Sequence, residues 1–324
     1  MTELALGDIV AARQRLGSHV WRTPLLPSEE LGRRAGAQVY LKLECWQHTG
    51  SFKVRGALSK LASLEPEECA RGVVTASAGN HGLGVAYAAK ALGLAPATIF
   101  LPEVATETKV RHLVAMHCHL RRAGADYDAA HAQAARYANA QGALYLSAYD
   151  DLAVIAGQGT VALEVLEELP DADLLLVPIG GGGLVAGVAV AARALRPGIR
   201  IIGVQPEASP AAYLSLRDGR PYETFPAEST ICDGLAGGFG RMPFEVAGRL
   251  IDDVLPVPES AVRHAVAWLA THEQLLVEGS GAIAIAPLLA GKALSPGRRA
   301  VAILTGRNID SLLLRQCLEE FDDA

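Results

Sequence analysis

The segment from Leu174 to Ala192 constrains the fold more than any other part of the chain. It carries no charged residue over 19 positions, which is close to the length of a membrane-spanning helix. Pro178 and four consecutive glycines, Gly180 to Gly183, interrupt it, so a continuous helix is not expected. The segment instead predicts a buried strand followed by a helix from about Leu184, as at the centre of a parallel sheet.

Strands and helices alternate through the rest of the chain as well. This pattern predicts an α/β fold with parallel sheets and crossover helices. Two runs of the alternation meet near residues 146–152, where we place a boundary. The expected strands cover 39–45, a stretch from 72, 97–103, 117–121, 174–179, 200–204 and 300–304, and the expected helices 1–20, 57–64, 82–93, 106–116, 127–141, 153–169, 184–195, 259–273 and 280–289.

Composition excludes several classes of protein. Half of the 324 residues are hydrophobic and a fifth are charged, so a large core is available and disorder is not expected. A net charge of -6 offers no basic surface for nucleic acid. The five cysteines are scattered without a close pair, which indicates reduced thiols in a cytoplasmic protein. The first 20 residues predict an amphipathic helix, not a signal peptide.

The four glycines between strand and helix predict a phosphate site. Several backbone N–H groups would meet at the positive end of a helix, and side chains would not block a close approach. A different interpretation is a dinucleotide fingerprint formed by Gly181, Gly183 and Ala186. That fingerprint requires an acidic residue about 20 positions later, where Gln205 stands, so it is the weaker interpretation.

A second stretch, TGSFKVRGA, carries a lysine suited to imine chemistry. Lys53 follows Phe52, and a lysine kept out of water beside an aromatic ring has a lowered pKa. The alternative is an ordinary surface lysine. An activated lysine together with a phosphate site indicates pyridoxal phosphate as the cofactor.

Three further stretches are candidates for ligand contacts. SAGNHG, which starts at Ser77, joins a strand to a helix, so its N–H groups could bind a carboxylate or merely cap the helix. Thr305 ends a strand in LTGRNID and could face a ligand or cap a turn. His117, Cys118 and His119 resemble a metal cluster, but no carboxylate lies nearby in the sequence, so we expect a solvated strand and no metal site.

Five motifs in this order resemble the fold-type II pyridoxal phosphate enzymes, specifically the threonine/serine dehydratase and serine racemase group: TGSFKVRGA, SAGNHG, PIGGGGL, TICDGLA and LTGRN. The resemblance covers nearly the whole chain and is closest to a short catabolic-type dehydratase. It implies a fold like that of the tryptophan synthase β chain, with two open, twisted, mostly parallel sheets flanked by helices. It also implies a large cofactor domain from residues 1–50 and 150–324, a small domain from 51–149 that closes over the substrate, and a homodimer.

The resemblance also assigns roles to single residues. Lys53 would form the imine with the cofactor and abstract the Cα proton, and Phe52 would pack against the cofactor ring. Thr305 would lie opposite the pyridine nitrogen, Glu278 near the cofactor, and Gly234 near the substrate side chain. The phosphate would be held by Gly180, Gly181, Gly182, Gly183 and Leu184, the 3-hydroxyl by Asn80, and the substrate carboxylate by Ser77, Ala78, Gly79, Asn80 and His81.

Several residues depart from the family pattern. Ala78 replaces a serine that racemases use as the acid on the opposite face, so efficient racemisation is not expected. Gln205 and, approximately, Ala211 stand where metal-binding members have carboxylates, so we expect no divalent-cation site. Thr305 replaces the more frequent serine, and we expect it to keep the role of the hydroxyl. Arg307 replaces a small residue and is expected to alter the charge of the site or its substrate. The chain ends soon after LTGRN, so we expect no regulatory domain.

Together these features predict a lyase that eliminates water from a 3-hydroxy-α-amino acid, giving a 2-oxo acid and ammonia. The expected substrate is L-threonine or L-serine. Bulkier 3-hydroxy amino acids, amino-acid racemisation on the same fold, and a nicotinamide-dependent oxidoreductase remain as alternatives.

Overall fold

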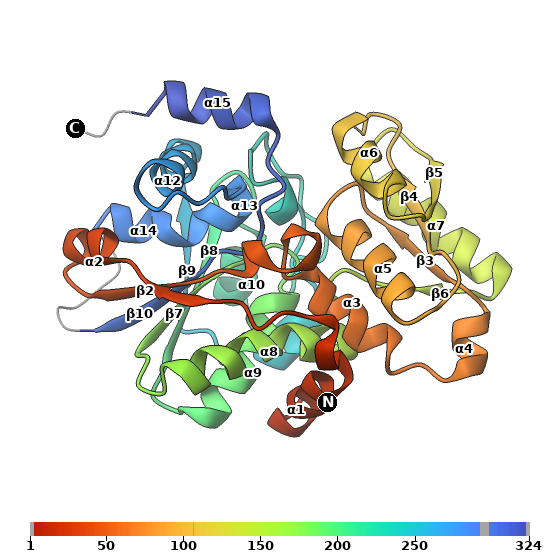
Figure 1. The fold of residues 1–324 in the computed structure, drawn as a ribbon, viewed down its shortest axis with the longest axis horizontal. Coiled ribbons are helices and arrows are strands. Elements are labelled where there is room, and N and C mark those ends of the chain that lie inside the picture. Colours follow the sequence, from red (N-terminus) through yellow and green to blue (C-terminus); the bar gives the residue numbers. More distant parts are fainter. Residues whose placement is uncertain (1–2, 106, 292–297, 322–324) are drawn as a thin grey trace.

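Two sheets flanked by helices organise the chain in the computed structural model, which describes residues 3–105, 107–291 and 298–321 (Figure 1). Neighbouring strands are parallel except for the antiparallel pair β1 and β2. The large sheet has the order β1 (Leu25–Pro27), β2 (Gln38–Lys42), β10 (Arg299–Ile303), β7 (Leu174–Pro178), β8 (Arg200–Pro206) and β9 (Asp253–Val257). The small sheet has the order β5 (His119–Arg122), β4 (Thr98–Leu101), β3 (Val73–Ala76) and β6 (Leu144–Tyr145).

The large sheet is buried on both faces, as the uncharged segment predicts. Leu175 and Val177 of β7 pack in one hydrophobic cluster, whereas Leu174 and Leu176 pack in the other, because successive strand residues point to opposite faces. The first face is covered by α1 (Leu6–Leu16), α8 (Leu152–Glu168) and α9 (Gly183–Leu195), and the second by α2 (Glu29–Ala35), α12 (Glu259–His272), α13 (Gly279–Ala282), α14 (Ala286–Leu289) and α15 (Ser311–Glu319).

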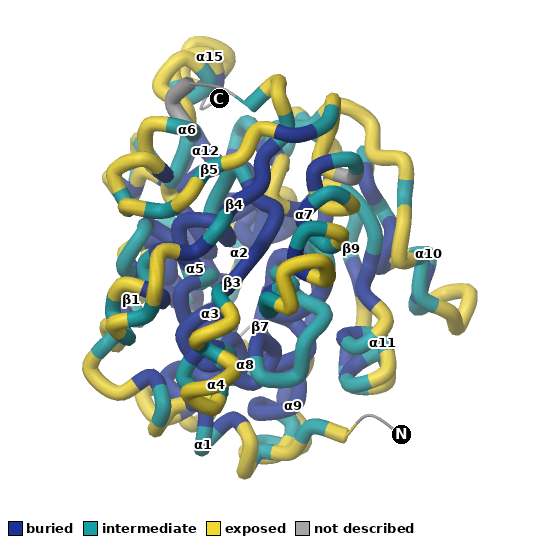
Figure 2. Tube along the Cα trace, turned by 90° about the vertical axis from the view of Figure 1, so that its right-hand side faces the viewer, coloured by how far each residue is buried: buried dark blue, intermediate teal, exposed yellow. Residues whose placement is uncertain are grey.

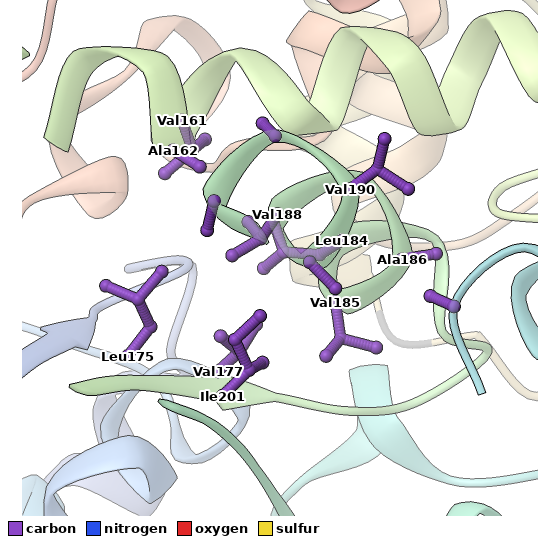
Figure 3. Packing of buried hydrophobic residues seen from close by; sticks show 14 of the residues in the cluster. Val161, Ala162, Leu175, Val177, Leu184, Val185, Ala186, Val188, Val190 and Ile201 are labelled. Carbon is purple, nitrogen blue, oxygen red and sulfur yellow. The ribbon is translucent and has the colours of Figure 1, made fainter. Parts of the chain in front are cut away.

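Helix α9 lies between the sheet and α8. Figure 3 shows Val185 of α9 directed toward Val177 of the sheet, with Val161 and Ala162 of α8 on the opposite side of the helix. Figure 2 shows α8 and α9 almost entirely in the colour of buried residues. These two helices therefore form an inner layer of the core.

Glycines allow three helices to approach unusually closely. A Cβ on Gly187 of α9 would overlap the Ile155 carbonyl of α8, and a Cβ on Gly157 of α8 would lie 2.5 Å from the Arg55 carbonyl of α3 (Lys53–Leu61). Since real Cβ atoms do not come this close to a carbonyl oxygen, only glycine permits these crossings. The result is a continuous stack of α3, α8 and α9, which connects the two sheets (Figure 1).

The small sheet is also covered on both faces. Val73 of β3 packs with α5 (Asn80–Ala91) and α3, whereas Val74 packs with α7 (Tyr127–Gln141) on the other side. Helix α6 (Glu107–Val114) packs on the α5 side through Leu113. All four strands of this sheet lie within residues 51–149, and all six strands of the large sheet lie outside that range.

The α/β class with mostly parallel sheets is confirmed, but some predicted boundaries are wrong. Helix α3 begins at Lys53 instead of residue 57, because Phe52 already has helical backbone angles. Strand β5 begins at His119, and His117 has a φ of 57°, so the two histidines do not share a strand. The predicted helix 280–289 is α13, a 3-10 turn and α14. Thr106, the predicted start of α6, and residues 1–2 lie outside the described part.

Several short elements were not predicted from the sequence. Strands of two to five residues carry too few side chains for a clear alternation, and short amphipathic helices near turns resemble loops. None of the described helices is long and apolar enough to cross a bilayer. The missed elements are β1, β6, β9, α2, α4 (Pro66–Ala70), α10 (Ala211–Asp218), α11 (Arg241–Ala247) and α15.

A buried ionic network joins α3 to the large sheet and α8. Arg55 donates to Glu44 at 2.7 Å and to Glu164 at 2.6 Å, and its side chain is fully buried. Lys42 of β2 donates to the same Glu164 at 2.6 Å. Burial by itself would raise the pKa of Glu164, but the charges and hydrogen bonds of Arg55 and Lys42 outweigh it and lower that pKa. Two positive and two negative groups thus compensate one another inside the protein.

Replacing Arg55→Met should destabilise the protein by about 3–5 kcal/mol near neutral pH, because it leaves two buried carboxylates with one lysine. In the unaltered protein, ionised Glu164 contributes to the free energy of unfolding at pH values above the usual carboxylate pKa. This stabilisation is lost as the pH falls through the lowered pKa of Glu164. In the variant Glu164 loses the Arg55 charge that lowers its pKa and stays buried, so its pKa should rise and the deficit should shrink on acidification. Urea unfolding at several pH values measures both effects.

The matched control is Arg33→Met, which removes an exposed ion pair with Glu30 and should change the free energy of unfolding by less than about 1 kcal/mol. A deficit for Arg55→Met that stays constant or grows as the pH falls would contradict the interpretation of the network.

Candidate active site

Lys53 is the first residue of α3, and its surroundings hold it in place. The N–H of Phe52 donates to the Thr305 carbonyl at 3.1 Å, and Ser51 forms an isolated bridge with Gly306. The loop before the lysine is therefore fastened to the end of β10. Gly84 of α5 allows that helix to approach the Lys53 backbone, since a Cβ there would lie 3.1 Å from the lysine carbonyl carbon.

The lysine amine lies in a largely apolar environment. Its Nζ donates to the Ala148 carbonyl at 3.4 Å and lies 5.1 Å from the centre of the Phe52 ring. Burial lowers the pKa of Lys53 to about 8, and the negative charge of Glu278 partly opposes that shift. The neutral amine, which nucleophilic or basic chemistry requires, is consequently reached at lower pH than for an exposed lysine.

Neighbouring segments pack closely on the glycine turn, which the sequence did not reveal. A Cβ on Gly181 would overlap the Tyr149 ring, and one on Gly182 would overlap the Phe239 ring. Gly182 also has a φ of 94°. A Cβ on Gly180 would lie 2.9 Å from the Gly234 carbonyl oxygen. Close packing of neighbouring segments therefore demands glycine here independently of any ligand.

The turn nevertheless retains the properties of an anion site. The N–H groups of Gly181 to Leu184 have no acceptor among the described residues, and they lie at the N-terminus of the 13-residue helix α9. The helix dipole and these donors together favour a phosphate. Ala148 accepts from Lys53, and the adjoining Tyr149 packs on the turn, which connects the lysine to this anion site.

The loop from Ser77 to His81 joins β3 to α5 and is a second candidate anion site. Ser77 is nearly buried, and its Oγ accepts from the Gly79 N–H at 3.1 Å. The N–H groups of Ala78, Asn80 and His81 have no acceptor within the described part of the chain. They can bind a carboxylate at the positive end of α5.

The His81 side chain faces away from such a ligand. Its Nε2 lies 3.0 Å from the Thr75 hydroxyl and 3.2 Å from the Leu146 carbonyl oxygen. Burial, with the nearby charge of Lys53, lowers the pKa of His81 to about 3. The imidazole is therefore neutral and structural, so only the backbone of His81 can contribute to a carboxylate site.

Asn80 has a fixed amide orientation. Its Nδ2 donates to Glu278 Oε1 at 2.5 Å, and its Oδ1 accepts from Asn308 Nδ2 at 2.6 Å. Asn308 also donates to the Thr49 carbonyl at 2.8 Å, so it joins the lysine loop to α5. Exchanging the two amide atoms of Asn80 would place its oxygen against the Glu278 carboxylate and its nitrogen against Asn308 Nδ2. Asn308 was not singled out as a site residue from the sequence, although it stands in LTGRN.

Thr305 and Gly234 meet at Ser280. The Thr305 hydroxyl donates to the Ser280 carbonyl at 3.2 Å, and the Gly234 N–H donates to the Ser280 Oγ at 3.0 Å. The Glu278 N–H donates to the Gly306 carbonyl at 3.0 Å. The start of α13 therefore brings Glu278, Gly234 and Thr305 together from three distant parts of the sequence.

Arg307 and Tyr149 show what the sequence did not reveal about the surroundings of the site. Arg307 does not enter the site; it is exposed and lines an open pocket of about 420 Å³ together with Trp21, Arg22, Thr23, Pro24 and Trp46. Tyr149, which packs on Gly181 and Gly183, was not identified from the sequence because no motif surrounds it. Among the described residues, no group of histidine, cysteine and carboxylate side chains could hold a metal ion.

Comparison with known proteins is consistent with this geometry. Residues 16–306 match the family described as pyridoxal-phosphate dependent enzyme. The chain is 42% identical to an L-threonine ammonia-lyase of Geobacter sulfurreducens over 93% of this chain and 75% of that one. It is 40% identical to a putative threonine dehydratase of Sinorhizobium fredii over 98% and 96% of the two chains.

Among solved structures, maize serine racemase superposes with a TM-score of 0.91 at 34% identity, covering 98% of this chain and 97% of that one. The similarity thus extends over both sheets and every motif of the site. The chain belongs to the family of pyridoxal-phosphate dependent enzymes.

Proposed function

We propose that this enzyme is a pyridoxal phosphate-dependent ammonia-lyase that eliminates water from L-threonine or L-serine and yields a 2-oxo acid and ammonia. The observation that carries the proposal is the neutral-prone amine of Lys53, held between a phosphate site and a carboxylate site. The similarity to proteins named threonine ammonia-lyase and threonine dehydratase supports this substrate class. Bulkier 3-hydroxy amino acids belong to the same proposal.

The residues present suit the cofactor. The unpaired N–H groups of Gly181 to Leu184 would take its phosphate, and Gly180 would complete the turn. Asn80, whose Nδ2 bears a second hydrogen, would donate to the 3-hydroxyl. Thr305 would face the pyridine nitrogen from the end of β10 with a neutral hydroxyl. Phe52, Glu278 and Gly234 would border the ring and the substrate side chain.

The chain's own residues would direct the reaction in three ways. The cofactor, when bound, supplies an electron sink for the substrate Cα. The loop from Ser77 to His81 would orient the substrate by its carboxylate. Lys53, with its lowered pKa, would take the Cα proton from one face. Because a neutral Thr305 cannot hold the pyridine nitrogen protonated as a carboxylate would, early loss of the β-hydroxyl is favoured over transamination.

Several wider features belong to the same proposal. Residues 51–149, which contain the small sheet, would move as a domain and close over the substrate, while residues 1–50 and 150–324 hold the cofactor. Closure would exclude water from the site. We also propose a homodimer, which the resemblance to the family implies, and a cytoplasmic location, which the absence of disulfides among the five cysteines supports.

Racemisation is the second candidate, because serine racemases are also similar to this chain. The local chemistry favours elimination. Ala78, in the carboxylate loop, has no hydroxyl that could return a proton from the face opposite Lys53. The nicotinamide alternative is not favoured, since both amide atoms of Gln205 are engaged by Ser209 and Tyr213.

The purified holoenzyme should release 2-oxo acid from L-threonine or L-serine in a panel of 3-hydroxy amino acids of both configurations. Lys53→Ala should lower this rate at least about a hundredfold, since it removes the proton acceptor. Lys90→Ala, an exposed lysine of α5, should leave the rate unchanged. Coloured enzyme that releases no 2-oxo acid from any member of the panel would refute the proposed activity while preserving the cofactor.

Capture of pyridoxal phosphate by the apoenzyme should speed up as the pH rises toward a plateau above about 8, because only the neutral Lys53 amine reacts. Glu278 raises the pKa of Lys53, so Glu278→Gln should shift this profile to lower pH. Borohydride trapping of the lysine-bound cofactor at timed intervals measures the rate. Glu319→Gln, at an exposed position of α15, serves as the charge control, and a shift of the Glu278→Gln profile to higher pH would contradict the assignment.

Ala78→Ser should raise the formation of D-serine from L-serine about tenfold or more, because a hydroxyl in the loop can donate a proton on the second face. Elimination should continue. Chiral chromatography of the product mixture gives both rates. Ala140→Ser, an exposed substitution in α7, is the control. A variant that still eliminates water but racemises no faster would show that Ala78 does not limit racemisation.

A further inference from the structure

Gln205 lies in β8, where the family resemblance would imply a carboxylate in metal-binding members. Its side chain is 1% exposed. The amide Nε2 donates to the Ser209 carbonyl at 2.7 Å, and Oε1 accepts from the Tyr213 N–H at 2.8 Å. One side chain therefore spans the whole turn from the end of β8 to the start of α10.

These residues do not suit a divalent cation. The amide orientation is determined, because its exchange would set oxygen against the Ser209 carbonyl and nitrogen against the Tyr213 N–H. The Ser209 carbonyl oxygen already accepts the Gln205 N–H, so it is not open to a hard cation. Ala211, the approximate second position, carries no oxygen in its side chain.

The turn held by Gln205 is connected to a second segment through Ser209. The Ser209 hydroxyl accepts from the Gly237 N–H at 3.0 Å and donates to the Gly237 carbonyl at 3.1 Å. Ser209 is fully buried, so water does not compete for these bonds. The segment 234–240 is therefore fastened to the turn at Gly237.

That segment runs alongside the glycine turn at three successive points. The Gly234 carbonyl and Leu235 leave no space for a Cβ on Gly180, and the Phe239 ring packs on Gly182. The Gly240 N–H donates to the Gly181 carbonyl at 3.1 Å. A displacement of segment 234–240 would therefore move the N–H groups that would hold the phosphate.

We propose that Gln205 is a positioning residue whose amide holds this turn in place of a bound cation. It locks the turn 205–213, which holds segment 234–240 and, through it, the glycine turn in the geometry that binds the phosphate. Cofactor affinity in this enzyme is therefore independent of divalent cations. This inference rests on the cofactor and not on the substrate, so it survives even if the enzyme acts on another amino acid.

The test measures the dissociation constant of pyridoxal phosphate from the apoenzyme by absorbance titration in EDTA, magnesium and calcium. The unaltered enzyme should give the same value in all three within about twofold. Gln205→Glu replaces the N–H donor by a carboxylate facing the Ser209 carbonyl, so its affinity in EDTA should be about tenfold weaker. Magnesium or calcium should restore part of that affinity, because two oxygens can then share a cation.

Two variants and one further measurement make the test decisive. Gln316→Glu introduces the same charge at an exposed position of α15 and should change nothing. Ser209→Ala keeps Gln205 but removes the link to Gly237, so it should weaken the cofactor about threefold or more in every buffer. The thermal midpoint of each apoenzyme is recorded as well, because a merely structural role would lower that midpoint without weakening the cofactor in the folded protein.

Three results would overturn the proposal. The first is cofactor binding by the unaltered enzyme that depends on magnesium or calcium. The second is a Gln205→Glu variant, or a Ser209→Ala variant if the former does not fold, that binds the cofactor in EDTA as tightly as the unaltered enzyme. The third is a folded Gln205→Glu variant that neither cation improves, which would refute the equivalence of amide and cation.

Discussion

The close approach of α3, α8 and α9 is the constraint on which the rest of the structure depends. Gly157 and Gly187 permit the backbones to touch, and the buried Arg55 network then links α3 to β2 and α8. This stack brings the first residue of α3 near the turn before α9, although 127 positions separate Lys53 from Gly180. Lys53 and the glycine turn thereby acquire a common rigid support.

Burial sets the protonation behaviour of the side chains around Lys53. The same burial that lowers the pKa of Lys53 also keeps His81 neutral, while Glu278 moderates the shift at the lysine. Asn80 and Asn308 then connect Glu278 to the lysine loop by two short hydrogen bonds and a third to Thr49. One hydrogen-bonded group of residues from four separate segments thus sets both the negative charge near Lys53 and the orientation of the Asn80 amide.

The glycine turn shows how one motif can satisfy two demands. Its N–H groups are suited to an anion, but the Tyr149 and Phe239 rings and the Gly234 carbonyl would exclude a Cβ even without one. Glycine composition alone therefore overstates the evidence for phosphate. The stronger evidence is that the N–H groups at the start of α9 have no acceptor in the described part of the chain. The Gln205 turn belongs to the same assembly, since it fixes the segment that packs on these glycines.

By itself the sequence determined the α/β class, the main strands and helices, and the motifs that carry Lys53, the glycine turn and the loop from Ser77 to His81, because local patterns and spacing encode these features. It did not show short strands such as β6 or the true start of α3, where tertiary contacts override local preference. Only the tertiary structure decided that Arg307 points outward, that Asn308 orients Asn80, and that Gln205 closes its turn. These outcomes depend on which distant segments meet, and that is settled by packing and by the pairing of buried polar groups.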